Sequence, residues 1–171
     1  METLYYTTLT TPIQSLLILS SEKGLVKIMF IDTKNNLFLH SLEKEYPDIT
    51  FIENKSRNQA ALDQLNEYFT GIRKNFTLPL DLRGTPFQKQ VWNALVQVPY
   101  GQTCSYGKIA SRIGKPKSAR AVGMANHNNP IPIVIPCHRI IGADGSLTGY
   151  GAGISIKEKL LNLEKENIGS N

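Results

Sequence analysis

The chain has 171 residues, 41% of them hydrophobic, so it can bury one large core or two small ones. An apolar run at residues 13–19 has no basic residue before it and no small-residue cleavage site after it, so we expect a strand there, and neither a signal peptide nor a membrane span. The two cysteines, Cys104 and Cys137, are too few for a disulfide framework or a multi-cysteine zinc site. They favour a cytoplasmic protein, and we expect no metal and no cofactor.

Charge is spread unevenly along the chain. The net charge of +5, from 19 basic and 14 acidic residues, indicates a polyanionic partner only weakly. Between Leu82 and Ala143, however, 62 residues contain no Asp or Glu, where even spreading would place about 5. The same stretch has eight basic residues: Arg83, Lys89, Lys108, Arg112, Lys115, Lys117, Arg120 and Arg139. This pattern favours a phosphate-binding surface over a solvated face that is basic by chance.

The first half of the chain has the pattern of a mixed α/β domain. Residues 4–31 alternate apolar and polar side chains, which predicts a meander of strands. A short helix is expected in 35–46, a strand in 49–53 and a second helix in 58–69. The extended, proline-broken segment that follows predicts a boundary between a first domain of residues 1–80 and a second of residues 84–168.

The second domain opens with a strong helix start. Thr85 is a suitable N-cap, Pro86 suits the first helical position, and Gln88 completes a capping box. One apolar stripe then follows: Phe87, Val91, Ala94, Leu95 and Val98. Trp92 lies beside this stripe, and we interpret it as core rather than as a platform for stacking bases.

Residues 105–125 have the pattern of a helix-turn-helix. Ser105 is expected to cap the first helix, Gly114 to end it, and Pro116 to start the second helix after a turn of about three residues. Small residues crowd the second helix: Ser118, Ala119, Ala121, Gly123 and Ala125. Such a slim helix suits a groove, yet only Arg120 and Asn126 could read base edges. The alternative is two packed helices with small residues where they cross.

The stretch "NHNNPIPIVIPCHRIIG" carries Cys137, His138 and Arg139 in an apolar setting. Its prolines exclude a helix and bring the chain to Cys137 on a stiff path. Two short strands are expected around Asp144 and Gly145, followed by a flexible glycine-rich loop. A capping box of Ser155 and Glu158 is expected to start a last helix with a buried stripe of Ile156, Leu160 and Leu163. Glu164 lies just off this stripe, from where it could reach a histidine.

"PYGQTCSYGKIA", "ARAVGMA" and above all "IPCHRII" resemble the O6-alkylguanine-DNA alkyltransferases, the methylated-DNA–protein-cysteine methyltransferases of direct DNA repair. The resemblance is strong from Thr85 to Glu164 and weaker before. It implies a ribonuclease H-like α/β N-terminal domain and a mainly α C-terminal domain with a winged-helix-like helix-turn-helix. It also implies a monomer that binds double-stranded DNA through the minor groove, flips an alkylated base out of the stack and accepts its alkyl group once, irreversibly.

The resemblance assigns roles to individual residues. Cys137 is the nucleophile, His138 holds it as a thiolate through a water, and Glu164 orients His138. Tyr106 crowds the target phosphate and bonds the flipped base, Arg120 fills the gap in the stack, and Asn129 ties the cysteine loop to the helix-turn-helix. The other expected DNA contacts are Lys117, Ser118, Ala119, Ala121 and Gly123. The expected pocket residues are Tyr150, the Gly151 backbone, Ile140 and Pro132. Some family members carry Ser at the position of Gly151, which leaves only a backbone N–H for contact there.

Three other functions compete. An alkyltransferase-like damage sensor would lack the cysteine present here, and a sequence-specific transcription regulator would need major-groove readers that the slim helix does not supply. A Cys-His hydrolase would need an oxyanion hole and a third orienting residue. Whether O4-alkylthymine is a substrate beside O6-alkylguanine is left open by the sequence.

Overall fold

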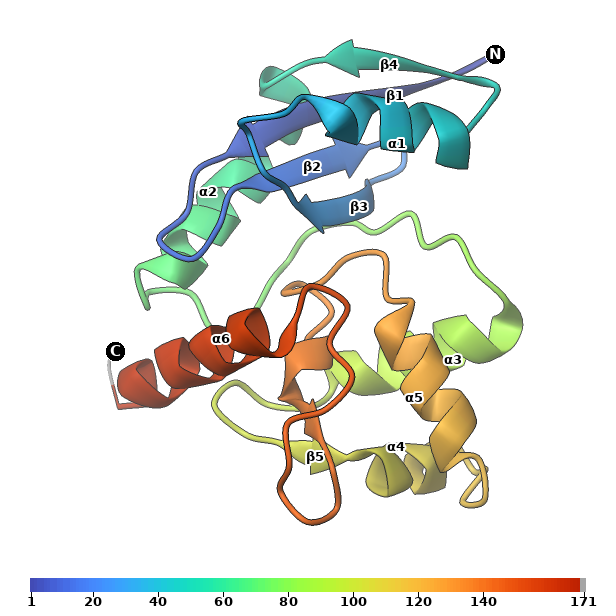
Figure 1. Ribbon diagram of the computed structural model, residues 1–171, viewed down its shortest axis with the longest axis vertical. Coiled ribbons are helices and arrows are strands. Elements are labelled where there is room, and N and C mark those ends of the chain that lie inside the picture. Colours follow the sequence, from blue (N-terminus) through green and yellow to red (C-terminus); the bar gives the residue numbers. More distant parts are fainter. Residues whose placement is uncertain (170–171) are drawn as a thin grey trace. The chain divides into compact units, whose positions relative to one another are not determined.

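A computed structural model of the chain describes residues 1–169 (Figure 1). The chain divides into two compact units, Met1–Leu82 and Arg83–Asn171. Each unit has its own buried residues, as the composition allowed. Within the described range, every helix is too short or too polar to cross a bilayer.

A four-stranded sheet forms the centre of the first unit. Its strands are β1 (Glu2–Leu9), β2 (Leu16–Ser20), β3 (Leu25–Phe30) and β4 (Ile49–Glu53), in the order β3-β2-β1-β4. The pairs β1–β2 and β2–β3 are antiparallel, which confirms the predicted meander, whereas β4 joins β1 in parallel. Every residue of β2 is buried, so both faces of the sheet are covered.

Two helices cover this sheet. Helix α1 (Leu37–Glu45) packs on the face that carries Leu17 and Leu19, and its Leu42 belongs to that core cluster. A short 3-10 turn, η1 (Ser56–Asn58), leads into α2 (Gln59–Phe69), which lies on the other face of the sheet (Figure 1). Both helices fall where the apolar spacing predicted them.

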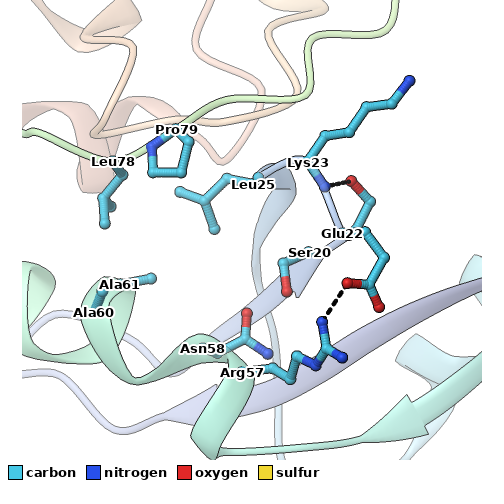
Figure 2. Close-up of a pocket in the computed structure, with 12 residues that line it drawn as sticks. Ser20, Glu22, Lys23, Leu25, Arg57, Asn58, Ala60, Ala61, Leu78 and Pro79 are labelled. Carbon is cyan, nitrogen blue, oxygen red and sulfur yellow. Dashed lines mark hydrogen bonds and ion pairs between the residues drawn. The ribbon is translucent and has the colours of Figure 1, made fainter.

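The turn between β2 and β3 packs against the segment that leads out of the first unit. The Pro79 carbonyl accepts a bond from the Leu25 amide at 2.9 Å, and the Asp81 amide donates to the Leu25 carbonyl at 2.7 Å. Figure 2 shows Leu25, Leu78 and Pro79 on one side of a cavity of about 210 Å³, with Asn58 and Ala61 on the other side. The extended segment is therefore part of the first unit's structure.

Gly24 lies at the tightest point of this contact. Its φ is +152°, and a Cβ there would lie 2.4 Å from the Pro79 carbonyl oxygen. We expect Gly24→Ala to destabilise the protein by about 2–4 kcal/mol, because the methyl group would push two backbone segments apart. Urea unfolding measures the loss. Gly145→Ala is the control, since a Cβ at Gly145 meets nothing within 4 Å although its φ is also positive, +86°. An equal loss of stability in both variants would show that the positive φ, and not the contact with Pro79, causes the loss.

Helices dominate the second unit. These are α3 (Pro86–Val96), α4 (Tyr106–Arg112), α5 (Ala119–His127) and α6 (Ile154–Asn167). The predicted capping box is confirmed, because the Thr85 hydroxyl accepts from the Gln88 amide and the Gln88 side chain accepts from the Thr85 amide. Trp92 is 1% exposed and donates to the Ala125 carbonyl at 2.8 Å, so its interpretation as core is confirmed. This bond fastens α3 to α5.

Three local predictions in the second unit are wrong. Helix α5 starts at Ala119 and not at Pro116, because Lys115 to Ser118 form a turn closed by the Ser118 amide and the Lys115 carbonyl. In place of two strands around Asp144, residues 142–146 form a turn held by the Asp144 carboxylate. The strand before it, β6 (Ile140–Ile141), pairs in parallel with the distant β5 (Cys104–Ser105). Helix α6 starts after Gly153 with no side-chain cap, so Ser155 and Glu158 form no capping box.

Candidate active site

A strained loop positions Cys137. Ile133 has a φ of +73°, which a β-branched side chain rarely adopts, and its side chain is buried. Asn129 holds the loop in this shape: its Oδ1 accepts from the Ile131 amide at 3.0 Å, and its Nδ2 donates to the Ile135 carbonyl at 2.8 Å. Asn129 follows the end of α5, so it links the helix-turn-helix to the cysteine loop, as expected from its implied role.

The three residues Cys137–Arg139 form a short 3-10 turn, η2, whose side chains all point into the protein. Cys137 is 3% exposed, His138 0% and Arg139 5%. Glu164, on α6, is completely buried and joins this group. Its carboxylate accepts bonds from His138 Nε2, from Arg139 Nε at 2.8 Å and from the Gly101 amide at 3.0 Å. The expected contact between Glu164 and His138 is therefore present.

The protonation of this group follows from its partners. Burial raises the pKa of Glu164, but its bonds with His138 and Arg139 outweigh burial and bring it to about 2. Burial lowers the pKa of His138, and Glu164 opposes this only in part. His138 is therefore neutral beside a carboxylate. Because a carboxylate can only accept, the proton of the imidazole is on Nε2, and Nδ1 is left as a base. Among residues 1–169, nothing forms a hydrogen bond with Nδ1.

Cys137 is a thiol in this state. Burial raises its pKa to about 11, although the nearby polar groups of Asn129 and Tyr150 and the charge of Lys157 act in the opposite direction. The resemblance implies a cysteine held as thiolate, and in this respect the DNA-free structure differs. A thiolate at Cys137 would require loss of the proton to a neighbouring base.

Lys157 is a site residue that the sequence analysis missed. Its side chain is completely buried, and its Nζ donates to the carbonyls of Ile140 and Thr148. Burial lowers the pKa of Lys157, and the nearby Cys137 raises it. The helical spacing did contain a signal, since Lys157, Leu160 and Glu164 share one face of α6. In the part of the chain that is described, no three His, Cys, Asp or Glu side chains gather as metal ligands would.

The glycine-rich loop before α6 closes over the cysteine. Tyr150 is 8% exposed, and burial and the neighbouring Cys137 raise the pKa of its hydroxyl well above the ordinary value. The Thr148 carbonyl accepts from Tyr106 at 3.1 Å, so Tyr106 on α4 holds the loop. A Cβ at Gly151 would lie 3.5 Å from the His127 carbonyl, which is an ordinary contact. Of the other two expected pocket residues, Ile140 is fully buried beside Cys104, and its carbonyl shares the Lys157 ammonium group with the Thr148 carbonyl of this loop, while Pro132 is half-buried.

The expected DNA-binding residues lie on or next to α5. Lys117, Arg120 and Ala121 are exposed, while Ser118, Ala119 and Gly123 are half-buried. Asn126 cannot read a base, because it is 2% exposed and donates to the Cys137 carbonyl. Arg139 likewise does not belong to the basic surface, since it is buried against Glu164 and the Val98 carbonyl. Six basic side chains of the acid-free stretch are exposed: Lys89, Lys108, Arg112, Lys115, Lys117 and Arg120.

A buried Cys-His-Glu group beside a helix-turn-helix is the arrangement expected of a cysteine-dependent enzyme with a DNA-binding motif. Residues 4–82 match "6-O-methylguanine DNA methyltransferase, ribonuclease-like domain", and residues 86–166 match "6-O-methylguanine DNA methyltransferase, DNA binding domain". The chain belongs to the 6-O-methylguanine DNA methyltransferase family. The resemblance and the fold class expected from the sequence are thereby confirmed.

Individual relatives are similar over nearly the whole chain. The methylated-DNA–protein-cysteine methyltransferase of Methanosarcina acetivorans is 47% identical over 161 residues, which are 94% of this chain and 98% of the relative. The constitutive enzyme of that name from Bacillus subtilis is 43% identical over 167 residues, 94% of this chain and 95% of the relative. A crystal structure of Mycobacterium tuberculosis OGT in complex with DNA is 44% identical with a TM-score of 0.81, and the match covers 95% of this chain and 94% of that one.

Proposed function

We propose that this chain removes the alkyl group from O6-alkylguanine in duplex DNA and keeps it on Cys137. The reaction class, direct-reversal repair by alkyl transfer to a cysteine of the protein, follows from family membership. The observation that most strongly supports Cys137 as the acceptor is its neighbour in the sequence. Cys137 precedes His138, whose Nε2 is bonded to the buried Glu164 carboxylate and whose Nδ1 is left as a base.

The chemical step is one displacement. Sγ of Cys137 attacks the alkyl carbon, a sulfur–carbon bond forms, and the bond between that carbon and O6 breaks with its electron pair moving to the base. The thiol proton passes through a water to His138 Nδ1 and is returned to the departing base, so that thiol and alkylguanine become thioether and guanine. Glu164 stabilises the imidazolium that forms in between. Lys157 and the Tyr150 hydroxyl stabilise the transient thiolate.

DNA binding uses α5 and the basic side chains around it. The exposed cations supply sequence-independent phosphate contacts, and the small residues of α5 let its backbone approach the minor groove closely. Arg120 fills the gap that the flipped base leaves, and Tyr106 exchanges its bond with the Thr148 carbonyl for one with the base. Of the two candidate base-reading side chains of this helix, Arg120 and Asn126, the second is buried. Arg120 alone does not suffice for a sequence-specific regulator. The protein acts as a monomer in the cytoplasm.

The test is a titration of the protein against an excess of duplex that contains O6-methylguanine. Repaired DNA should rise linearly with added protein and stop at one lesion per molecule, because a thioether offers no leaving group to water. Mass spectrometry should then find one alkyl group on the peptide that contains Cys137, and an unalkylated duplex is the control. Several turnovers per molecule without added thiol would contradict the proposal.

A further inference from the structure

Helix α5 presents one large apolar side chain outward. Val122, Ala125 and Asn126 turn inward, and Gly123 faces the ring of Tyr106. The outward face carries Arg120, Met124 and His127, which are spaced four and three residues apart. Met124 is 60% exposed, whereas the side chains around it on this helix are small.

The setting of Met124 indicates what covers it. An exposed methionine leaves apolar surface in water that a partner can bury. The helix-turn-helix around it exposes Lys108, Arg112, Lys115, Lys117 and Arg120, and no acidic residue occurs between Leu82 and Ala143. This charge is complementary to phosphates. In the minor groove, apolar side chains such as methionine pack against sugar edges or wedge between base steps.

We propose that Met124 is a minor-groove contact, one helical turn from Arg120, that buries its thioether side chain against the deoxyribose walls of the duplex. This inference rests on the proposed function, in which α5 docks on DNA. A flexible methionine adapts to grooves of different width without reading their sequence. Met124 therefore adds affinity for duplex DNA and not preference for a base.

The position of Met124 on α5 explains why this contact matters for repair. The C-terminal end of α5 meets the loop that contains Tyr150 and Gly151. The His127 carbonyl lies 3.5 Å from the position that a Cβ on Gly151 would take. At the other end, Arg120 is placed to replace the flipped base. Met124 lies between these two ends and holds the helix in the groove while the base crosses to the cysteine. Its side chain is 60% exposed on the outward face of α5, so its loss should not affect the reaction with a free base.

The test compares Met124→Ala, Met124→Leu and a matched control, Val96→Ala, which removes a 46% exposed apolar side chain from α3. Three quantities are measured: the second-order rate on duplex containing O6-methylguanine, the rate with free O6-benzylguanine, and the Kd for undamaged duplex. Met124→Ala should weaken duplex binding and slow duplex repair by about 5- to 20-fold, because most of an apolar side chain is lost from a buried contact. The free-base rate should not change. Met124→Leu and Val96→Ala should stay within about 2-fold of the parent protein.

Each contrary result has a separate meaning. Equal slowing of Met124→Ala on duplex and free base would overturn the proposal, because Met124 would then support the site itself. Unchanged duplex binding would overturn it as well. The proposal would also be overturned if sedimentation showed that the parent protein associates with itself without DNA and that Met124→Ala abolishes this association. The outward face of α5 would then bind a second copy of this chain. If the parent protein fails to take alkyl groups from any substrate, the proposed function fails, but the Kd for undamaged duplex still tests Met124.

Discussion

Cys137→Ser should abolish alkyl transfer, with a loss of at least about 10⁴-fold in rate, while duplex binding stays within about 2-fold of the parent protein. The reason is the acidity of the attacking group. Burial already raises the pKa of the thiol to about 11, and a hydroxyl in the same place is a far weaker acid that the neutral His138 cannot deprotonate. The exposed basic side chains that bind phosphates are untouched.

The second cysteine supplies the matched control. Cys104 is also buried, at 5% exposure, but it lies in β5 beside Ile140 and forms no part of the Cys-His-Glu group. Cys104→Ser should retain transfer, and mass spectrometry should still find the alkyl group on Cys137. Both variants are compared by single-turnover repair of labelled duplex and by a gel-shift titration. Loss of transfer in Cys104→Ser together with normal transfer in Cys137→Ser would reverse the assignment of the acceptor.

Glu164→Gln is expected to have the largest effect on stability, about 3–5 kcal/mol. The neutral amide cannot balance the guanidinium of Arg139, which at 5% exposure has little access to solvent that could replace the carboxylate. The change also weakens the partner of His138, so the surviving folded protein should transfer alkyl groups more slowly. Urea unfolding gives the free energy, and Glu158→Gln, an exposed position on the same helix, is the control.

The same carboxylate makes stability depend on pH. The pKa of Glu164 is lowered to about 2 from an ordinary value of 4.5, so its contribution is complete above pH 4.5 and is lost as the pH falls towards 2. His138 acts in the same direction, because burial lowers its pKa and protons then favour the unfolded chain below about pH 6.5. In Glu164→Gln, the free energy of unfolding should depend less on pH between pH 4.5 and 2. The pH dependence above 4.5, which comes from His138, should remain. If the variant loses stability between pH 4.5 and 2 as steeply as the parent protein does, other carboxyl groups cause that loss.

Local patterns in the sequence determined most elements of this protein. Alternation predicted the three antiparallel strands, and the capping box of Thr85 and Gln88 predicted the start of α3. "IPCHRII" and its neighbours pointed to the family, and the position of Glu164 beside the α6 stripe allowed it to reach a histidine, which the resemblance implied to be His138. The strand and helix inferences succeeded because each depends on residues within a few turns of one another, whereas the pair of Glu164 and His138 joins residues 26 apart and was expected from the resemblance.

Tertiary structure alone decided which polar side chains are buried. Arg139 turned from the basic surface into the core because the Val98 carbonyl and Glu164, 41 and 25 residues away, offer it partners there. Lys157 is buried because the carbonyls of Ile140 and Thr148 converge on its Nζ, and Asn126 because the Cys137 carbonyl meets it. A charged or polar group enters a core only where distant segments bring it partners, and spacing along the chain does not contain that information.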